Sequence, residues 1–180
     1  MISPIEFKEK WNKEVYPLIK YDIDKVNKLS IPIESKQLLT EAGLPDSAAP
    51  FLNFESIDSG ALLTLKEKYN VDKYEEYIYI GFNGNGDILA IENKTGIVVS
   101  INHETFEKVY VNKSIPQLAE SLLEYADFIK TIKEINGRKA YLNRECPKEQ
   151  LEVIKNKLNN IDNKSIGNNT FWAEEISLFE

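Results

Sequence analysis

The fold class of this chain follows from residues 78–91, which read Ile-Tyr-Ile-Gly-Phe-Asn-Gly-Asn-Gly-Asp-Ile-Leu-Ala-Ile. Two β-rich runs, 77–82 and 88–92, lie on either side of a segment made of Asn, Gly and Asp. Gly and Asn tolerate a positive φ, which the tight turns of β-hairpins require. The stretch therefore predicts two antiparallel strands joined by a short connection.

The same pattern continues downstream with short β-rich runs at 96–101 and 107–111. Residues 93–96, Asn-Lys-Thr-Gly, separate the second run from the third and again suit a hairpin. Weaker strands are predicted upstream at 52–54 and 62–65. Together these segments predict an antiparallel meander.

Helix signals flank the meander on both sides. Ser3 and Glu6 have the spacing of a capping box, and the helix they open is predicted to run to about Tyr16, just before a proline. A second helix is predicted at 35–42, because Gly43 then ends it. The N-terminal part of the chain is thus predicted to be helical.

The longest predicted helix covers residues 114–135 and again begins with a capping-box pattern, Ser114 followed by Gln117. Apolar residues recur along it every three or four positions and form one stripe, which we expect to lie across one face of the meander. The stripe consists of Ile115, Leu118, Leu122, Tyr125, Ile129 and Ile132. Further on, helices are predicted at 147–161 and 170–179, and a short strand at 138–143.

These segments place the chain in the α+β class, with a mainly antiparallel sheet, helices packed on one face of it, and a helix at each end. At 180 residues the chain has the usual size of one domain, so we expect residues 1–180 to form a single domain. Trp11 and at least half of the nine tyrosines are expected in its core. The remaining tyrosines and the second tryptophan are candidate anchors for a partner.

Cysteine usage and hydropathy bear on the compartment. Cys146 is the only cysteine and has no partner within the chain, which fits a reducing environment. The N-terminus lacks the continuous apolar run of a signal peptide, and no stretch approaches the roughly 20 apolar residues of a membrane span. We therefore expect a cytoplasmic protein without a membrane segment.

The formal net charge is −7, and it is concentrated in the middle of the sequence. Residues 41–128 contain six basic and fifteen acidic residues, whereas 1–40 and 129–180 are nearly balanced. An acidic centre repels nucleic acid and anionic membranes, so it predicts a basic protein partner; the alternative is a surface that only aids solubility. The carboxylates we expect to contact the partner are Glu75, Glu76, Asp87, Glu92 and Glu104.

The Asn-Gly-rich turn has two possible chemical interpretations, and the sequence argues against both. Asn83, Asn85 and Asp87 have the alternate spacing of the first ligands of a calcium loop, but Ile88 stands where that loop needs Gly and Lys94 where it needs Glu. A phosphate loop would have to lead into a helix, and this turn leads into a strand. No metal and no cofactor is therefore predicted.

His103 is the only histidine and is followed by Glu104. A zinc site needs several His or Cys ligands, so these residues do not predict one. Cys146, His103 and a carboxylate could in principle act as nucleophile, base and orienting group, but no local motif such as Gly-x-Ser-x-Gly supports this. We predict no catalytic residue and no enzyme; a small-molecule hydrolase that uses His103 and nearby carboxylates is the third of three hypotheses.

The order of these motifs resembles the SUKH superfamily, which also includes the Smi/Knr-type fungal regulators of glucan synthesis. The resemblance covers roughly residues 33–135, and the closing Phe-Trp-Ala-Glu-Glu at 171–175 resembles the tail of one immunity branch. It is carried by the Glu-Ala-Gly-Leu-Pro segment 41–45, the hairpin 78–91, the turn and strand 93–98 and the helix entry 111–114.

This resemblance implies a non-catalytic immunity protein that neutralises a polymorphic bacterial toxin by covering it. A toxin that acts on nucleic acid would suit the acidic centre, because such proteins hold phosphates with basic residues. We expect the chain to be a monomer or a weak homodimer that binds protein, and neither nucleic acid nor membrane. A regulatory interaction domain of the Smi/Knr type is the second hypothesis. Residues 55–76 match nothing in the family pattern, so the resemblance does not indicate which surface contacts the partner.

Overall fold

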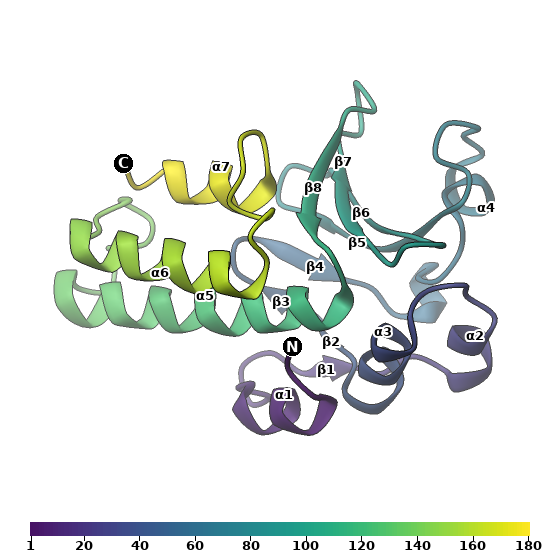
Figure 1. Ribbon diagram of the computed structural model, residues 1–180, viewed down its shortest axis with the longest axis horizontal. Helices are drawn as coiled ribbons and strands as arrows, with labels where there is room; N and C mark the ends of the chain where they lie inside the picture. The colour runs from purple at the N-terminus through teal and green to yellow at the C-terminus, as the bar shows by residue number, and fades with distance from the viewer.

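The computed structural model describes all 180 residues and has an α+β fold with two antiparallel sheets. Strands of the six-stranded sheet lie side by side in chain order, so the predicted meander is confirmed (Figure 1). This sheet contains β3 (Ser47–Ala48), β4 (Leu52–Phe54), β5 (Tyr77–Asn83), β6 (Ile88–Glu92), β7 (Val98–Ile101) and β8 (Lys108–Asn112). The second sheet, which the sequence did not predict, pairs β1 (Leu18–Ile19) with β2 (Leu44–Pro45).

Seven α-helices surround the sheets. Figure 1 shows α5, α6 and α7 beside the large sheet, while α1, α2 and α3 lie below it in this view, with α1 beneath α5. Their bounds are α1 Pro4–Lys10, α2 Ile23–Asn27, α3 Ile33–Gln37, α4 Leu65–Tyr69, α5 Ile115–Asn136, α6 Lys148–Ile161 and α7 Phe171–Ser177. A π-helical turn, Leu38–Ala42, continues α3, and a 3-10 turn covers Ile57–Ser59.

The main hydrophobic core lies between the sheet and α5. Ile80 and Leu89 from the sheet belong to the same buried cluster as Leu122 of α5, so the predicted stripe is core. The cluster also includes Phe7 and Trp172, and it therefore joins the two ends of the chain. Trp11 and five of the nine tyrosines are buried, as expected.

The opposite face of the sheet carries a second, smaller hydrophobic cluster. It contains seven buried residues, among them Tyr77, Tyr79 and Val99, and Leu65 of α4 covers it. β5 is buried on both faces over its first five residues. Such a strand reads as a continuous apolar run, so its sequence does not reveal that each face has its own cover.

The first helix is shorter than predicted. The Ser3–Glu6 capping box is present, but the chain leaves the helical conformation at Trp11, whose ψ is 133°. The Trp11 indole N–H donates to the carbonyl of Tyr16 at 2.9 Å, which closes a turn over residues predicted to be helical. Helix α1 therefore ends one turn after Phe7, because Trp11 is buried in the core.

Two predicted strands were also wrong. In residues 62–65, only Thr64 forms a β-bridge, and its side chain instead caps α4 through a full capping box with Glu67. Residues 138–143 form turns between α5 and α6. The second predicted capping box is half formed: Ser114 caps Gln117 N–H, while the Gln117 amide donates to the carbonyl of Ile161 at 2.7 Å.

Candidate functional site

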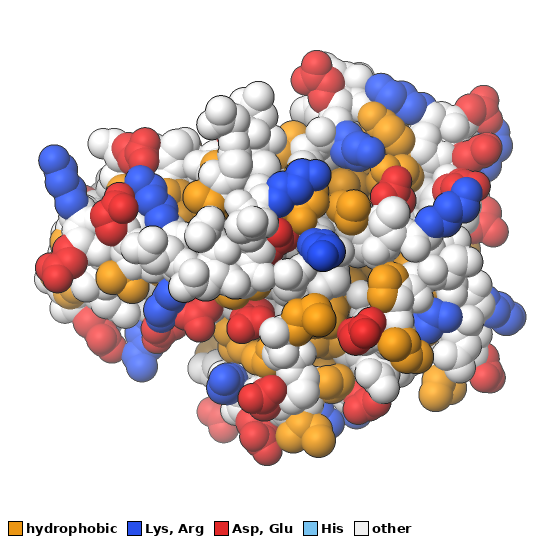
Figure 2. All heavy atoms as spheres, viewed as in Figure 1, with side chains coloured by type: hydrophobic (Ala, Val, Ile, Leu, Met, Phe, Trp, Pro, Cys, Tyr) orange, Lys and Arg blue, Asp and Glu red, His pale blue; other side chains and the backbone are white.

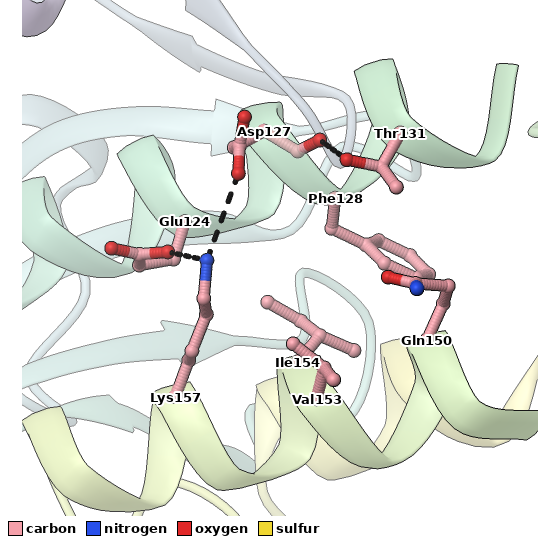
Figure 3. Close-up of a pocket in the computed structure, with 8 residues that line it drawn as sticks. All are labelled: Glu124, Asp127, Phe128, Thr131, Gln150, Val153, Ile154 and Lys157. Atoms are coloured by element: carbon pink, nitrogen blue, oxygen red, sulfur yellow. Dashed lines mark hydrogen bonds and ion pairs between the residues drawn. The ribbon is translucent and has the colours of Figure 1, made fainter. Parts of the chain in front are cut away.

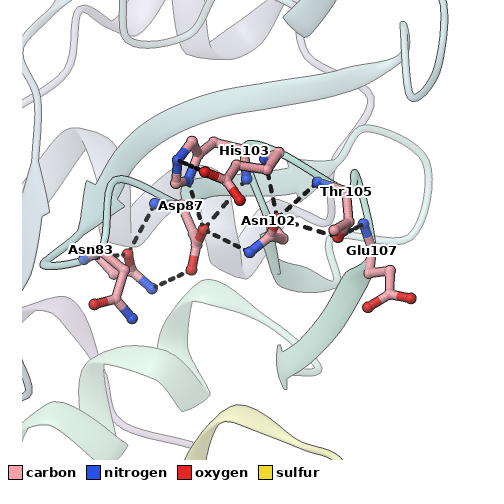
Figure 4. Close-up of polar contacts among 8 residues, drawn as sticks. Asn83, Asp87, Asn102, His103, Thr105 and Glu107 are labelled. Carbon is pink, nitrogen blue, oxygen red and sulfur yellow. Dashed lines mark hydrogen bonds and ion pairs between the residues drawn. The ribbon is translucent and has the colours of Figure 1, made fainter.

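Asp87 ties the two hairpin turns at one end of the sheet together (Figure 4). Its carboxylate accepts hydrogen bonds from the side-chain amides of Asn83 at 3.1 Å and Asn102 at 3.2 Å, and lies 3.0 Å from Nδ1 of His103. Asn83 Oδ1 in turn accepts from the backbone N–H groups of Asn85 and Asp87. Asn83 and Asp87, which resembled calcium ligands, therefore organise the turns.

His103 sits at the outer side of this network, with 46% of its side chain exposed. Its Nε2 lies 3.8 Å from Oε1 of Glu104. Cys146 is in the loop between α5 and α6, which Figure 1 places away from the β7–β8 turn, and burial raises the pKa of its thiol. The structure therefore does not join His103 and Cys146 into one catalytic set. No group of three or more His, Cys, Asp or Glu side chains is placed to hold a metal ion.

A groove with a volume of about 220 Å³, which we call the acidic groove, lies between the Asp87 network and α7. Its lining residues include four carboxylates and no lysine or arginine. The sheet contributes Asn83, Asn85, Asp87, Ser100, Asn102, Glu107 and Val109, and α7 contributes Phe171, Glu174 and Glu175.

Glu175 is the most perturbed carboxylate of the groove. Burial raises its pKa to about 7, although the guanidinium of Arg144 opposes that shift. The Oε2 atom of Glu175 is buried and accepts no hydrogen bond, and Nη1 of Arg144 is likewise unpaired. Arg144 instead lies over the rings of Tyr141 and Phe179, at 5.1 and 5.2 Å. The α7 wall of the groove thus carries hydrogen-bonding capacity that the chain itself does not use.

An exposed apolar residue stands next to the groove. Phe51, in the turn between β3 and β4, exposes 54% of its surface. The register pairs its neighbour Leu52 with Asn83 of the groove, and Phe51 closely approaches Gly84 in the β5–β6 turn. Its ring also lies 6.0 Å from that of Tyr141. An aromatic ring so placed could bury more surface only against another molecule.

A second hollow, between α5 and α6, holds about 30 Å³ (Figure 3). That volume is close to the share of one water molecule in the liquid, about 30 Å³. Lys157 spans it, with Nζ 2.7 Å from Glu124 and 3.6 Å from Asp127. We interpret it as a helix–helix contact closed by ion pairs.

The five carboxylates predicted to contact a partner do not form one patch. Asp87 and Glu104 lie at the end of the sheet that carries the groove, whereas Glu75, Glu76 and Glu92 lie at the opposite end. The two sets are separated because β6 runs the length of the sheet between Asp87 and Glu92.

The carboxylates at the two ends also differ in the ion pairs and hydrogen bonds that they form. Glu76 pairs with Lys94 at 3.0 Å. Glu92 accepts hydrogen bonds from the hydroxyls of Tyr77 and Thr95, and the bond from Thr95 is the main reason that its pKa is lowered. Glu75 and Glu104 are exposed. Of the two predicted carboxylates at the groove end, Glu104 is the more exposed, with 80% of its side chain in solvent.

Lysines moderate the acidity of the sheet's second face. Lys68 lies over the ring of Tyr79 at 4.0 Å, and Lys108 lies over the ring of Tyr77 at 5.1 Å and donates to its hydroxyl. Figure 2 shows basic side chains among acidic ones over the sheet in this view. The acidic middle of the sequence is thus not a uniformly acidic surface.

Sequence reasoning missed Glu107, Glu174 and Glu175. The sequence predicted a helix at 170–179, but nothing in it indicated that the carboxylates of α7 line the same groove as the Asp87 network. The comparison with known families adds the missing context. The family model described as SUKH-4 immunity protein matches residues 17–180.

The chain belongs to the SUKH-4 immunity protein family. The resemblance to the SUKH superfamily is thereby confirmed, and the match extends beyond 33–135 at both ends to include β1 and α7. No curated protein and no solved structure matches the chain. None of the helices of this SUKH-4 chain combines the length and the apolar character needed to cross a membrane.

Proposed function

We propose that this SUKH-4 chain protects the cell that makes it by binding a toxin in an equimolar complex that covers the toxin's active site. The observation that carries the proposal is the family match over residues 17–180. An inhibitor of this kind needs a preformed surface with an apolar anchor and complementary charge around it. Phe51 and the acidic groove supply both elements, and the two lie close together, since Phe51 approaches Gly84 in the β5–β6 turn.

The proposal treats residues 1–180 as one domain that acts in the cytoplasm as a monomer or weak homodimer. The main core, which contains both Phe7 of α1 and Trp172 of α7, supports the first part. We also propose that inhibition requires no catalysis by the chain. In support, Asp87 and His103 contact each other within a network that holds two turns in place.

The partner we propose is a basic toxin domain, such as one that acts on nucleic acid. The net charge of −7 supports this, because an acidic inhibitor is steered toward a basic target. Among the carboxylates we expected at the interface, Glu75 and Glu104 are the best placed to act by steering, since both are exposed. Asp87 and Glu92 are proposed to contribute charge while they also hold their turns.

The proposal is tested by co-expressing the chain with the toxin domains of the same genome, beginning with any encoded beside its gene. One of them should kill cells alone and leave them alive with the chain, and size-exclusion chromatography with light scattering should show an equimolar complex. His103→Ala is the matched control, and it should protect as well as the unmodified chain. If no toxin domain is bound or neutralised, or if protection requires His103, the proposal is wrong.

A further inference from the structure

We propose that the acidic groove receives an arginine side chain from a surface loop of the toxin, and that Phe51 packs against the same loop. This inference rests on the proposed function and names the contact through which it works. It places the principal contact at the end of the sheet beside α7, and leaves Glu75 and Glu76 at the other end as steering charges only.

The charge of the groove supports a cation as its occupant. The carboxylates of Asp87, Glu107 and Glu174 converge on it from the sheet and from α7, together with Glu175, whose charged form is disfavoured by burial, and none of its lining residues is basic. Like charges gathered in a concave surface reinforce one another, since the protein walls screen them less than water does. A cationic group that enters the groove would relieve this repulsion.

The unused hydrogen-bonding capacity supports a planar, multidentate cation. Oε2 of Glu175 is buried without a donor, and the carboxylates of Glu174 and Glu107, which line the groove, add further acceptors. A guanidinium offers five N–H donors in a fixed fork that fits a carboxylate by two bonds, whereas an ammonium is a compact point charge. Arginine therefore matches the groove better than lysine does.

The size of the groove supports a single side chain. Its volume of about 220 Å³ is below the range of about 300–1,000 Å³ that is usual for pockets binding small molecules. It is nevertheless several times the volume of a water molecule, about 30 Å³. An inserted arginine would carry the loop that bears it across the β5–β6 turn, where Phe51 approaches Gly84.

Argininamide and citrullinamide provide a test that does not need the toxin. The two probes differ in that citrulline has a neutral urea group in place of the guanidinium. In proton–nitrogen NMR titrations of the full chain, argininamide should shift the side-chain amides of Asn83 and Asn102 and the backbone amides of Glu174 and Glu175. Equal shifts with citrullinamide, or no shifts at these residues, would overturn the proposal.

The second arm uses the toxin domain identified by co-expression. Replacing Glu174 and Glu175 by Gln together, or Phe51 by Ala, should weaken binding by about tenfold or more, mainly through faster dissociation. The matched control, Glu75→Gln with Glu76→Gln, should leave dissociation unchanged. Thermal unfolding of each variant checks its fold, and Glu175→Gln is expected to fold at least as stably because it removes a charge from a buried position.

The two arms separate the two proposals. If the unmodified chain binds no toxin domain, the proposed function is wrong, while the argininamide titration still decides whether the groove takes a guanidinium. If the chain binds and protects but the groove variants dissociate no faster, the proposed function stands and the groove is not the contact.

Discussion

Replacing Glu175 by Gln should make the folded protein more stable at pH 8 and leave its stability at pH 4 unchanged. Burial of Glu175 raises its pKa from an ordinary value of 4.5 to about 7, so the folded state binds this proton more tightly than the unfolded chain does. The stabilising contribution of the protonated carboxyl is thus complete below pH 4.5 and is lost as the pH rises through 7.

The magnitude follows from the linkage between proton binding and folding. A shift of this size corresponds to roughly 3 kcal/mol for a fully buried group, at about 1.4 kcal/mol for each pH unit. Glu175 keeps part of its surface in water, and Arg144 attracts its charged form. After this screening we expect roughly 1–2 kcal/mol at pH 8, a substantial part of an ordinary domain's stability.

Urea unfolding followed by circular dichroism at intervals between pH 4 and pH 9 measures the effect. The difference between the unmodified chain and Glu175→Gln should grow between about pH 4.5 and 7 and then level off. Glu174→Gln is the matched control, because it removes an exposed carboxylate one residue away. A constant difference at all pH values would show that folding does not raise the pKa of Glu175, and a less stable Glu175→Gln at pH 8 would show that Arg144 pairs with a charged Glu175 in the folded state.

Three further predictions test the core and the steering charges. Leu122→Ala should lower the free energy of unfolding by about 2–5 kcal/mol in urea, since Leu122 is 1% exposed in the main core; an unchanged midpoint would contradict this. Asn112→Ala should cost about 1–3 kcal/mol in the same assay, because it leaves the buried indole N–H of Trp172 without its 2.9 Å acceptor; a neutral effect would mean that water replaces it. Glu75→Lys with Glu76→Lys should slow toxin association and flatten its salt dependence in stopped-flow measurements while dissociation changes little; rates unaffected by both salt and charge would rule out steering.

The strand predicted at residues 62–65 was wrong because composition was given more weight than capping chemistry. Residues 62–65, Leu-Leu-Thr-Leu, looked like a strand because they are apolar and contain a β-branched residue. The capping box of Thr64 with Glu67 was nevertheless visible in the sequence and marks the start of α4. The small sheet of β1 and β2 offered no comparable sign, since each of its strands has only two residues.

Most of the helices and strands could be predicted from the sequence alone, because they depend on interactions between residues close together in the chain. Turn residues and β-rich runs indicated the hairpins from β5 to β8, and the apolar stripe of α5 indicated both the helix and its burial. These features depend on residues within a few positions of each other, so a short window of sequence contains their cause. The family resemblance has the same origin, because it rests on the order of such motifs.

Only the tertiary structure decided where the acidic groove lies. Its two walls, the Asp87 network and Glu174 and Glu175 of α7, are far apart in the sequence. They are brought together because α7 docks beside β8. The Trp172 indole N–H donates a hydrogen bond to Asn112 there, and Thr170 forms a β-bridge with Tyr110. Burial of Trp172 sets the position of α7, and this position places Glu174 and Glu175 at the groove. Pairings over such separations depend on the packing of the whole core, which no local pattern encodes.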